Sequence, residues 1–203
     1  FDFMFRIPGW ADKFTVVKDE ADTKVQQQNG FARLQITKGC RIKIMFESSV
    51  QEHETNDGIY FSKGPLVYCY GLTGKRERDR NEKRSSETFP AYNIYANDKW
   101  NYAVKRGSES TFVPGTQTGF DLNKDLPSIR VQAFEAPEWS LEQCNKIKVC
   151  DDLYKKTTHT ESGRFLFTPS PQSVGHISDC AQALTLRPYG AGKLRVTVFP
   201  VKP

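Results

Sequence analysis

The chain has 203 residues, of which 37% are hydrophobic, 12% aromatic and 26% charged, and its formal net charge is +5. This length allows one large or two small domains with a buried core, and the composition argues against a disordered chain. No window reaches the roughly 18 uninterrupted apolar residues of a membrane span. We therefore do not expect a membrane protein. Because charges of both signs are interleaved, we do not expect a nucleic-acid-binding protein either.

The first ten residues, FDFMFRIPGW, do not start with Met and already alternate like a strand. They contain neither the basic region nor the long apolar region of a signal peptide. We therefore expect the chain to be a fragment or a processed form of a longer protein.

Alternation of apolar and polar residues with a period of two predicts strands along most of the chain. The clearest cases are RIKIMF, SIRVQAF and KLRVTVF, at residues 41–46, 128–134 and 193–199. Asn29-Gly30 separates the runs KVQQQ and FARLQI, and this dipeptide predicts a type I′ hairpin turn between two strands. The remaining predicted strands are 3–7, 14–17, 58–61, 65–70, 164–168 and 183–187.

Many short strands separated by Gly, Pro, Asn and Asp turns predict an all-β fold of antiparallel β-sandwiches, jelly-roll-like in form. Residues 138–149 are the one candidate for a short helix. The polar stretch 48–58 has no apolar periodicity and predicts a linker. We therefore expect residues 1–52 to be the remnant of a first sandwich that upstream strands would complete, and residues 53–203 to be a complete C-terminal sandwich.

The five cysteines, at positions 40, 69, 144, 150 and 180, form no CxxC pair, and the three histidines are far apart in sequence. This spacing predicts no metal site. Either the nearest pair, Cys144 and Cys150, forms a disulfide outside the cytosol, or all five are unpaired thiols that pack as small apolar residues. Cys69 lies in the most apolar run, KGPLVYCYGL, where burial raises a thiol pKa, so we expect a packing residue rather than a nucleophile.

Motifs for catalysis are missing from the sequence: it has no glycine-rich phosphate loop and no nucleophile elbow, and its acids are scattered. A glycosidase needs two carboxyls across a cleft, which spacing alone does not establish. We therefore assign no catalytic residue to this chain. The stretch GKRERDRNEKR, residues 74–84, has six basic and three acidic residues; we interpret it as a solvated loop, with a polyanion-binding patch as the alternative.

Aromatic residues are the candidates for ligand binding. Trp100 and Trp139 lie beside turn residues, and Trp100 and Tyr102 would share one face of a strand because a single residue separates them. Aromatic rings presented on a sandwich stack on the apolar faces of sugars, so Trp100, Tyr102 and Trp139 are candidate carbohydrate-binding residues. The alternative is that these rings fill the space between two sheets.

Four sequence blocks together carry a family resemblance: FRIPGWA at 5–11, KGPLVYC at 63–69, KWNYAV at 99–104 and LRPYGAGKLRVTVFPV at 186–201. In this order they resemble the region after the catalytic domain in glycoside hydrolase family 127, the β-L-arabinofuranosidase-like proteins. Two positions depart from that pattern. Cys40 stands where relatives commonly have Asp, and Gly71-Leu72-Thr73 replaces residues that are often acidic.

The resemblance implies that an upstream helical (α/α) barrel carries out the reaction and that two β-sandwich domains follow it. In that family a zinc-bound cysteine is the nucleophile and glutamates assist, but these residues belong to the barrel and none maps onto this chain. The implied function is a non-catalytic region of a glycoside hydrolase, inactive alone and without a cofactor of its own, with the barrel and a plant-type oligo- or polysaccharide as partners. The alternative is an autonomous carbohydrate-binding module. We expect the parent protein to be secreted or periplasmic.

Overall fold

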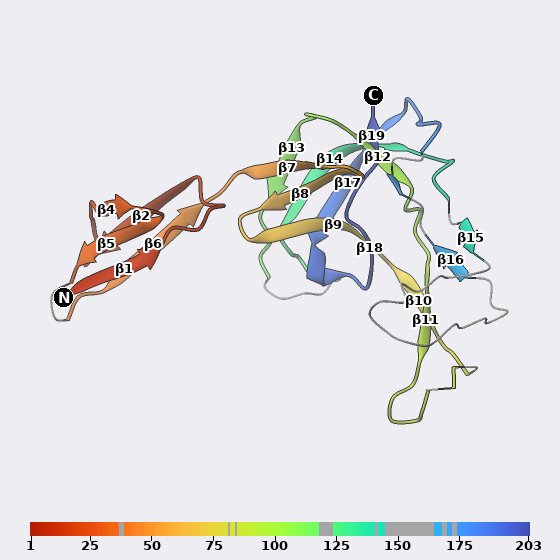
Figure 1. Cartoon of the computed structure of the whole chain (residues 1–203), viewed down its shortest axis with the longest axis horizontal. Coiled ribbons are helices and arrows are strands. Elements are labelled where there is room, and N and C mark those ends of the chain that lie inside the picture. Colours follow the sequence, from red (N-terminus) through yellow and green to blue (C-terminus); the bar gives the residue numbers. More distant parts are fainter. Residues whose placement is uncertain are drawn as a thin grey trace.

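The computed structural model consists almost entirely of β-strands (Figure 1). It describes residues 1–36, 39–80, 82–83, 85–117, 124–140, 142–144, 165–167, 170–171 and 174–203. Its strands form two units, an N-terminal unit of β1 to β6 and a C-terminal unit of β7 to β19. Among the described strands every pair except the parallel β12 and β19 is antiparallel. The predicted all-β, antiparallel class is therefore confirmed.

The N-terminal unit consists of two three-stranded antiparallel sheets. One contains β1 (Asp2–Arg6), β5 (Phe31–Gln35) and β4 (Gln26–Gln28), and the other contains β3 (Ala21–Asp22), β2 (Lys13–Lys18) and β6 (Ile42–Glu47). The turn from β4 to β5 holds Asn29 and Gly30 at φ values of 53° and 76°. A type I′ turn needs these positive values at both central residues, so the predicted hairpin is confirmed.

Aromatic rings connect the two sheets of the N-terminal unit. The ring of Phe5 on β1 lies 5.8 Å from that of Phe14 on β2 and 6.5 Å from that of Phe46 on β6, edge to face in both cases. In the described part of this unit, the buried apolar residues are Val16, Ala32 and Leu34. A core of this size stabilises a free-standing sandwich only marginally.

The C-terminal unit is built on a nine-stranded sheet. Its main strands, in spatial order, are β19 (Val201–Lys202), β12 (Tyr102–Lys105), β14 (Ser128–Glu135), β17 (Ala181–Pro188), β9 (Leu66–Leu72), β8 (Gly58–Lys63) and β7 (Val50–Thr55). In addition, β13 (Ser110–Val113) pairs with β14, and β18 (Leu194–Val196) pairs with β9. Because β9 and β14 each exchange partners along their length, the sheet can curve around one core.

The core of the C-terminal unit follows the predicted alternation. On β14, Ile129, Val131 and Ala133 are buried, whereas Arg130 and Gln132 are exposed. The same core contains Ile59, Phe61, Tyr68, Leu186 and Phe199. Phe199 comes from the segment predicted as a strand over 193–199, but the strand ends at Val196. Beyond it, the backbone of Phe199 forms an isolated bridge with Ile59.

The polar stretch 48–58 connects the two units only at Ser48 and Ser49, and the prediction of a linker is wrong for the rest of it. Its residues Val50–Thr55 form β7, which pairs with β8 along its whole length. Since β7 is the edge strand of the sheet, most of its side chains face solvent and it needs no apolar face, which removes the periodic signal. The predicted boundary between residues 52 and 53 falls inside this strand, and the division into 1–52 and 53–203 stays a prediction.

The connection between the two units is made by Ser48 and Ser49. The carboxylate of Asp12, from the N-terminal unit, accepts hydrogen bonds from the N–H of Ser49 at 2.5 Å and from its hydroxyl at 2.7 Å. These bonds hold the pKa of Asp12 below its ordinary value. From the C-terminal unit, the ammonium of Lys63 donates to the carbonyl oxygen of Ser48. Both units therefore bind the short segment that joins them.

Two small sheets lie beside the large one. In the first, β15 (Glu142–Cys144) pairs with β16 (Phe165–Phe167). The predicted helix is therefore wrong at residues 142–144, because the apolar β16 supplies a ladder partner that the local sequence does not reveal; residues 145–149 lie outside the described residues. In the second, β10 (Gly74–Arg78) and β11 (Tyr92–Ala96) form a hairpin that projects from the C-terminal unit (Figure 1). The first part of the predicted loop at 74–84 is thus a strand.

Candidate functional site

A pocket of about 760 Å³ lies at the base of the β10–β11 hairpin. Residues 94–96 of β11 line it, together with residues 194–196 of β18, the segment 98–101 and Trp139. Its lining combines apolar and aromatic side chains with a few charged groups. This combination is typical of sites that bind small molecules or single sugar units.

Trp100 and Trp139 meet in this pocket. Their ring centroids are 4.9 Å apart and the planes make an angle of 66°, an edge-to-face arrangement. Trp139 is 2% exposed and packs with Ala103 and Ala136, whereas Trp100 is half-buried and lies over this cluster. The buried indole therefore holds the more accessible one in place, which presents a rigid aromatic surface to the pocket.

Asn101 fixes the two loops that carry these rings. Its side-chain amide donates to the carbonyl oxygen of Ala136 at 3.0 Å, and its own carbonyl oxygen accepts from the N–H of Ala136 at 2.9 Å. The N–H of Trp139 donates to the same Ala136 carbonyl oxygen at 2.9 Å. Two segments that are distant in sequence are thus joined directly beneath the tryptophan pair.

Tyr102 is separated from Trp100, contrary to the prediction that the two share a strand face. The N–H of Tyr102 donates to the carbonyl oxygen of Trp100 at 3.0 Å, so the chain turns between them and β12 begins only at Tyr102. The Tyr102 ring is 7% exposed and packs edge to face on Tyr70, 5.7 Å away, in the main core. Of the three candidate residues, the structure brings together Trp100 and Trp139.

Charged groups at the rim of the pocket are held by neighbouring residues. The ammonium of Lys99 lies 2.6 Å from the carboxylate of Glu135, and the carboxylate of Asp98 accepts a hydrogen bond from the N–H of Thr73. The guanidinium of Arg195 lies 3.8 Å from the centroid of the Tyr189 ring. These groups can donate and accept hydrogen bonds around the tryptophan pair, as the hydroxyls of a sugar require.

Sequence reasoning did not select Tyr95, Lys99 and Arg195 as lining residues. Tyr95 is 52% exposed and lies in the stretch 89–102, whose five aromatic residues are the available sequence signal. Arg195 was expected on the polar face of a strand, where nothing in its neighbours marks it as part of a pocket. It reaches the site because β18 pairs with β9, a contact across more than a hundred residues.

Cys69 lies outside this pocket, in the centre of the sheet. Its side chain is fully buried, and the thiol donates to the carbonyl oxygen of Tyr189 at 3.9 Å. Burial raises the pKa of this thiol to about 11, and the positive charge of Arg195 opposes this shift. The packing role predicted for Cys69 agrees with this geometry.

The other cysteines give no metal cluster in the described part of the chain. Cys40, Cys69 and Cys180 are free thiols, and Cys150 of the suggested Cys144–Cys150 pair lies outside the described residues. No group of three His, Cys, Asp or Glu side chains within the described ranges is arranged to hold a metal ion. None of the helices described is both long and apolar enough to span a membrane.

Comparison with known proteins gives a likeness in fold. No protein-family model and no curated protein matches the sequence. A solved structure described as a glycoside hydrolase matches with a TM-score of 0.53 and 16% identity, over 100% of this chain and 28% of its own. A GH127 β-L-arabinofuranosidase from Geobacillus stearothermophilus T6 matches with a TM-score of 0.48 and 15% identity, over 100% of this chain and 26% of its own. This chain thus spans less than a third of either structure, and the first match shows that it has the fold of one segment of a glycoside hydrolase.

Proposed function

We propose that this chain is the non-catalytic β region of a glycoside hydrolase of the β-L-arabinofuranosidase type. The observation that carries the proposal is the match of the entire chain, both units included, to 28% of a solved glycoside hydrolase. The four sequence blocks that resemble family 127 support the finer assignment. In this proposal an upstream helical barrel, together with the zinc ion it holds in that family, carries out the reaction, and the whole protein works outside the cytosol.

The open N-terminal unit supports an upstream partner. Its exposed apolar side chains are Phe1, Phe3, Met4, Trp10, Phe31 and Met45. Its described core is small, so additional chain packed against these side chains would bury area that solvent now covers. The proposal therefore predicts that the upstream reading frame encodes the strands that complete the first sandwich and, before them, several hundred residues with helical periodicity. An upstream region of a different class, or an upstream stop codon, would contradict it.

The enzymatic part of the proposal has a direct test. The isolated chain of 203 residues is expected to be inert toward an aryl β-L-arabinofuranoside, because the residues assigned to the chemistry lie in the upstream barrel. Chromogenic assay of the purified chain measures this, and a mock purification from the same host controls for contaminating enzyme. Turnover that co-purifies with the chain would overturn the non-catalytic assignment.

A second candidate function is an autonomous carbohydrate-binding module, and the tryptophan pair favours it. A rigid, half-exposed indole in a pocket of this size suits stacking on one sugar ring. Trp100→Ala is expected to weaken binding to an arabinose-containing polysaccharide by about 30-fold, corresponding to about 2 kcal/mol for loss of a central aromatic contact.

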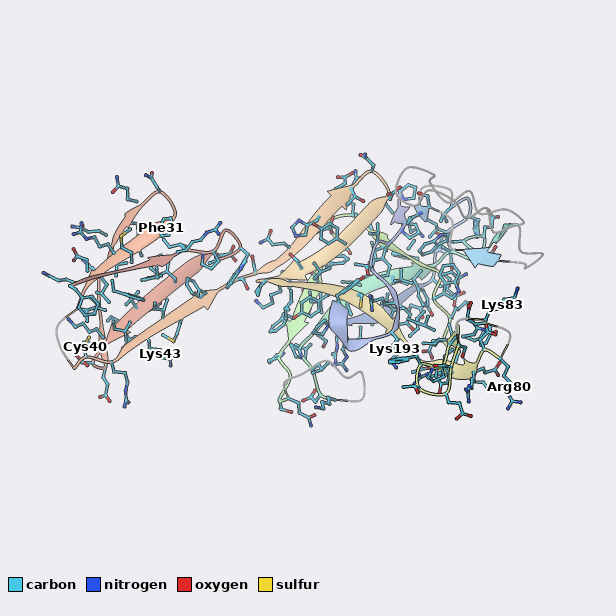
Figure 2. The ribbon with its side chains drawn as sticks, turned by 60° about the horizontal axis from the view of Figure 1, so that its bottom comes forward. Phe31, Cys40, Lys43, Arg80, Lys83 and Lys193 are labelled. Atoms are coloured by element: carbon cyan, nitrogen blue, oxygen red, sulfur yellow. The ribbon has the colours of Figure 1, made fainter. Side chains whose placement is uncertain are left out.

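Affinity electrophoresis in gels that contain the polysaccharide measures this change. Tyr95→Ala, on the exposed rim, tests the same pocket without touching the buried Trp139. Phe31→Ala is the matched control, since this ring is 43% exposed and lies on the N-terminal unit (Figure 2). Equal retardation of wild type and both pocket variants, or no retardation of wild type on any arabinose-containing glycan, would sink the module function.

A further inference from the structure

The β10–β11 hairpin is highly exposed: every residue of β10 and all but one of β11 face solvent. Its two strands pair only with each other among the described strands, with Lys75 opposite Tyr95 and Arg78 opposite Tyr92. It projects from the body of the unit in Figure 1. A two-stranded ribbon surrounded by solvent gains little stability from packing, so its side chains are available for contacts outside the chain.

Exposed aromatic rings gather on this hairpin. Phe89 is 78% exposed, Tyr95 52% and Tyr92 38%. The other large apolar side chain that is exposed in the described part of the C-terminal unit is Tyr189, which Arg195 links to the rim of the pocket. Exposed aromatic residues concentrated on one element of a unit mark a surface that meets a partner.

Cations are interleaved with these rings. The guanidinium of Arg76 lies 3.5 Å from the centroid of the Tyr92 ring, a cation–π contact that orients both groups. Arg78 is exposed on the same strand, and Figure 2 shows Arg80 and Lys83 extending into solvent from the turn side of the hairpin. Residues 74–96 contain six basic and four acidic residues, so the hairpin sequence carries a net charge of +2.

The hairpin and the tryptophan pocket form one continuous surface. Ile94, Tyr95 and Ala96 belong to β11 and also line the pocket that contains Trp100 and Trp139. A ligand longer than one sugar unit that enters the pocket would therefore continue along the hairpin.

We propose that this continuous surface binds an acidic oligosaccharide, a glycan with uronic-acid units. The inference rests on the proposed contact of the pocket with carbohydrate and adds the charge of the ligand. The tryptophan pair would take one sugar ring, while Arg76 and Arg78 would pair with carboxylates of the following units. Guanidinium groups suit this task because they form paired hydrogen bonds to a carboxylate. The acidic side chains interleaved on the hairpin repel anionic ligands. This repulsion is stronger for a densely charged polyanion such as nucleic acid than for a glycan with one charge per sugar.

The experiment compares polygalacturonate with neutral arabinan in native affinity gels, using the full 203-residue chain. The double variant Arg76→Glu, Arg78→Glu is expected to bind polygalacturonate about tenfold more weakly, because two surface charge pairs become repulsive. Arg6→Glu, Lys43→Glu is the matched control, with the same charge change on exposed residues of the N-terminal unit. Arg76→Lys, Arg78→Lys keeps the charge but loses the paired hydrogen bonds, so its loss of binding is expected to be smaller than that of the Glu variant.

Each outcome separates the inference from the proposal it rests on. Retardation by arabinan but not by polygalacturonate, with sensitivity to Trp100→Ala, would overturn the acidic ligand and leave carbohydrate binding intact. Retardation by neither glycan would overturn both. Equal losses of polygalacturonate binding in the hairpin variant and the control would mean that the net charge of the chain, and not the hairpin, attracts the glycan, and would refute the proposed surface. Binding of single-stranded oligo(dT) as tight as that of polygalacturonate, through the same arginines, would identify a general polyanion surface and refute the glycan.

Discussion

Cys69 offers a quantitative test of the arrangement at the centre of the sheet. The perturbation is alkylation of the native protein with iodoacetamide, which reacts with the thiolate. At pH 8 a thiol with the ordinary pKa of 9.0 is about 10% thiolate, whereas a pKa of about 11 leaves about 0.1%. The lower thiolate fraction therefore slows the alkylation of Cys69 by about 100-fold. The side chain is also fully buried, so the strand must open before the reagent can reach it.

Peptide mass spectrometry after timed labelling gives the rate for each cysteine. Exposed Cys180 serves as the internal standard in the same sample, and labelling in concentrated urea shows that both peptides are detected equally well. Labelling of Cys69 at a rate within about tenfold of Cys180 in folded protein would refute the reasoning. It would mean that β9 is accessible and that the pocket walls, which depend on the pairing of β9 with β18, are not formed as described.

Two further predictions concern stability. Gly58→Ala is expected to destabilise the chain by about 1–3 kcal/mol in urea denaturation, because Gly58 has φ of 149° and an added Cβ would lie 2.2 Å from the carbonyl oxygen of Phe199. Gly9→Ala is the control, because the space around Gly9 is open. Equal urea midpoints for the two variants would contradict the close approach of Gly58 to Phe199. The lowered pKa of Asp12 contributes stability that is present above its ordinary pKa of 3.8 and is lost as the pH falls through the folded value. Asp12→Asn should therefore lower the urea midpoint at neutral pH and lose that difference in acid, and a constant difference at both pH values would speak against the Ser49 contact.

The strands that sequence predicted well are those with one buried face. Ile42, Ile44 and Phe46 on β6 point inward between exposed neighbours, as do the apolar residues of β14. Alternation works there because each strand lies between a core and solvent. The Asn29-Gly30 turn was equally predictable, because few other dipeptides adopt two positive φ angles in succession.

The strands that sequence missed are stabilised by pairing rather than by an apolar face. β7 is an edge strand with the polar sequence VQEHET, and β10 reads GKRER in a ribbon open to solvent on both sides. Their backbone bonds come from β8 and β11, and a local pattern does not contain that information.

The candidate site was half predictable. Trp100 and Trp139 were chosen by residue type, and the structure places them in contact. Tyr102 was chosen by its spacing from Trp100, and that reasoning failed because a turn interrupts the strand between them. Arg195 joins the pocket through pairing with a distant strand, so its role depends on the tertiary fold alone.

The position of β17 in the middle of the large sheet constrains how the chain folds as it leaves the ribosome. β17 spans Ala181–Pro188, yet it lies between β14 and β9, two strands that are made much earlier. Until it is synthesised, the sheet exists as two separate groups of strands with unpaired edges, β7–β8–β9 and β12–β13–β14. From the synthesis of β14 until that of β17, nascent chains of this protein should therefore expose two unpaired strand edges and depend on chaperone binding during that interval.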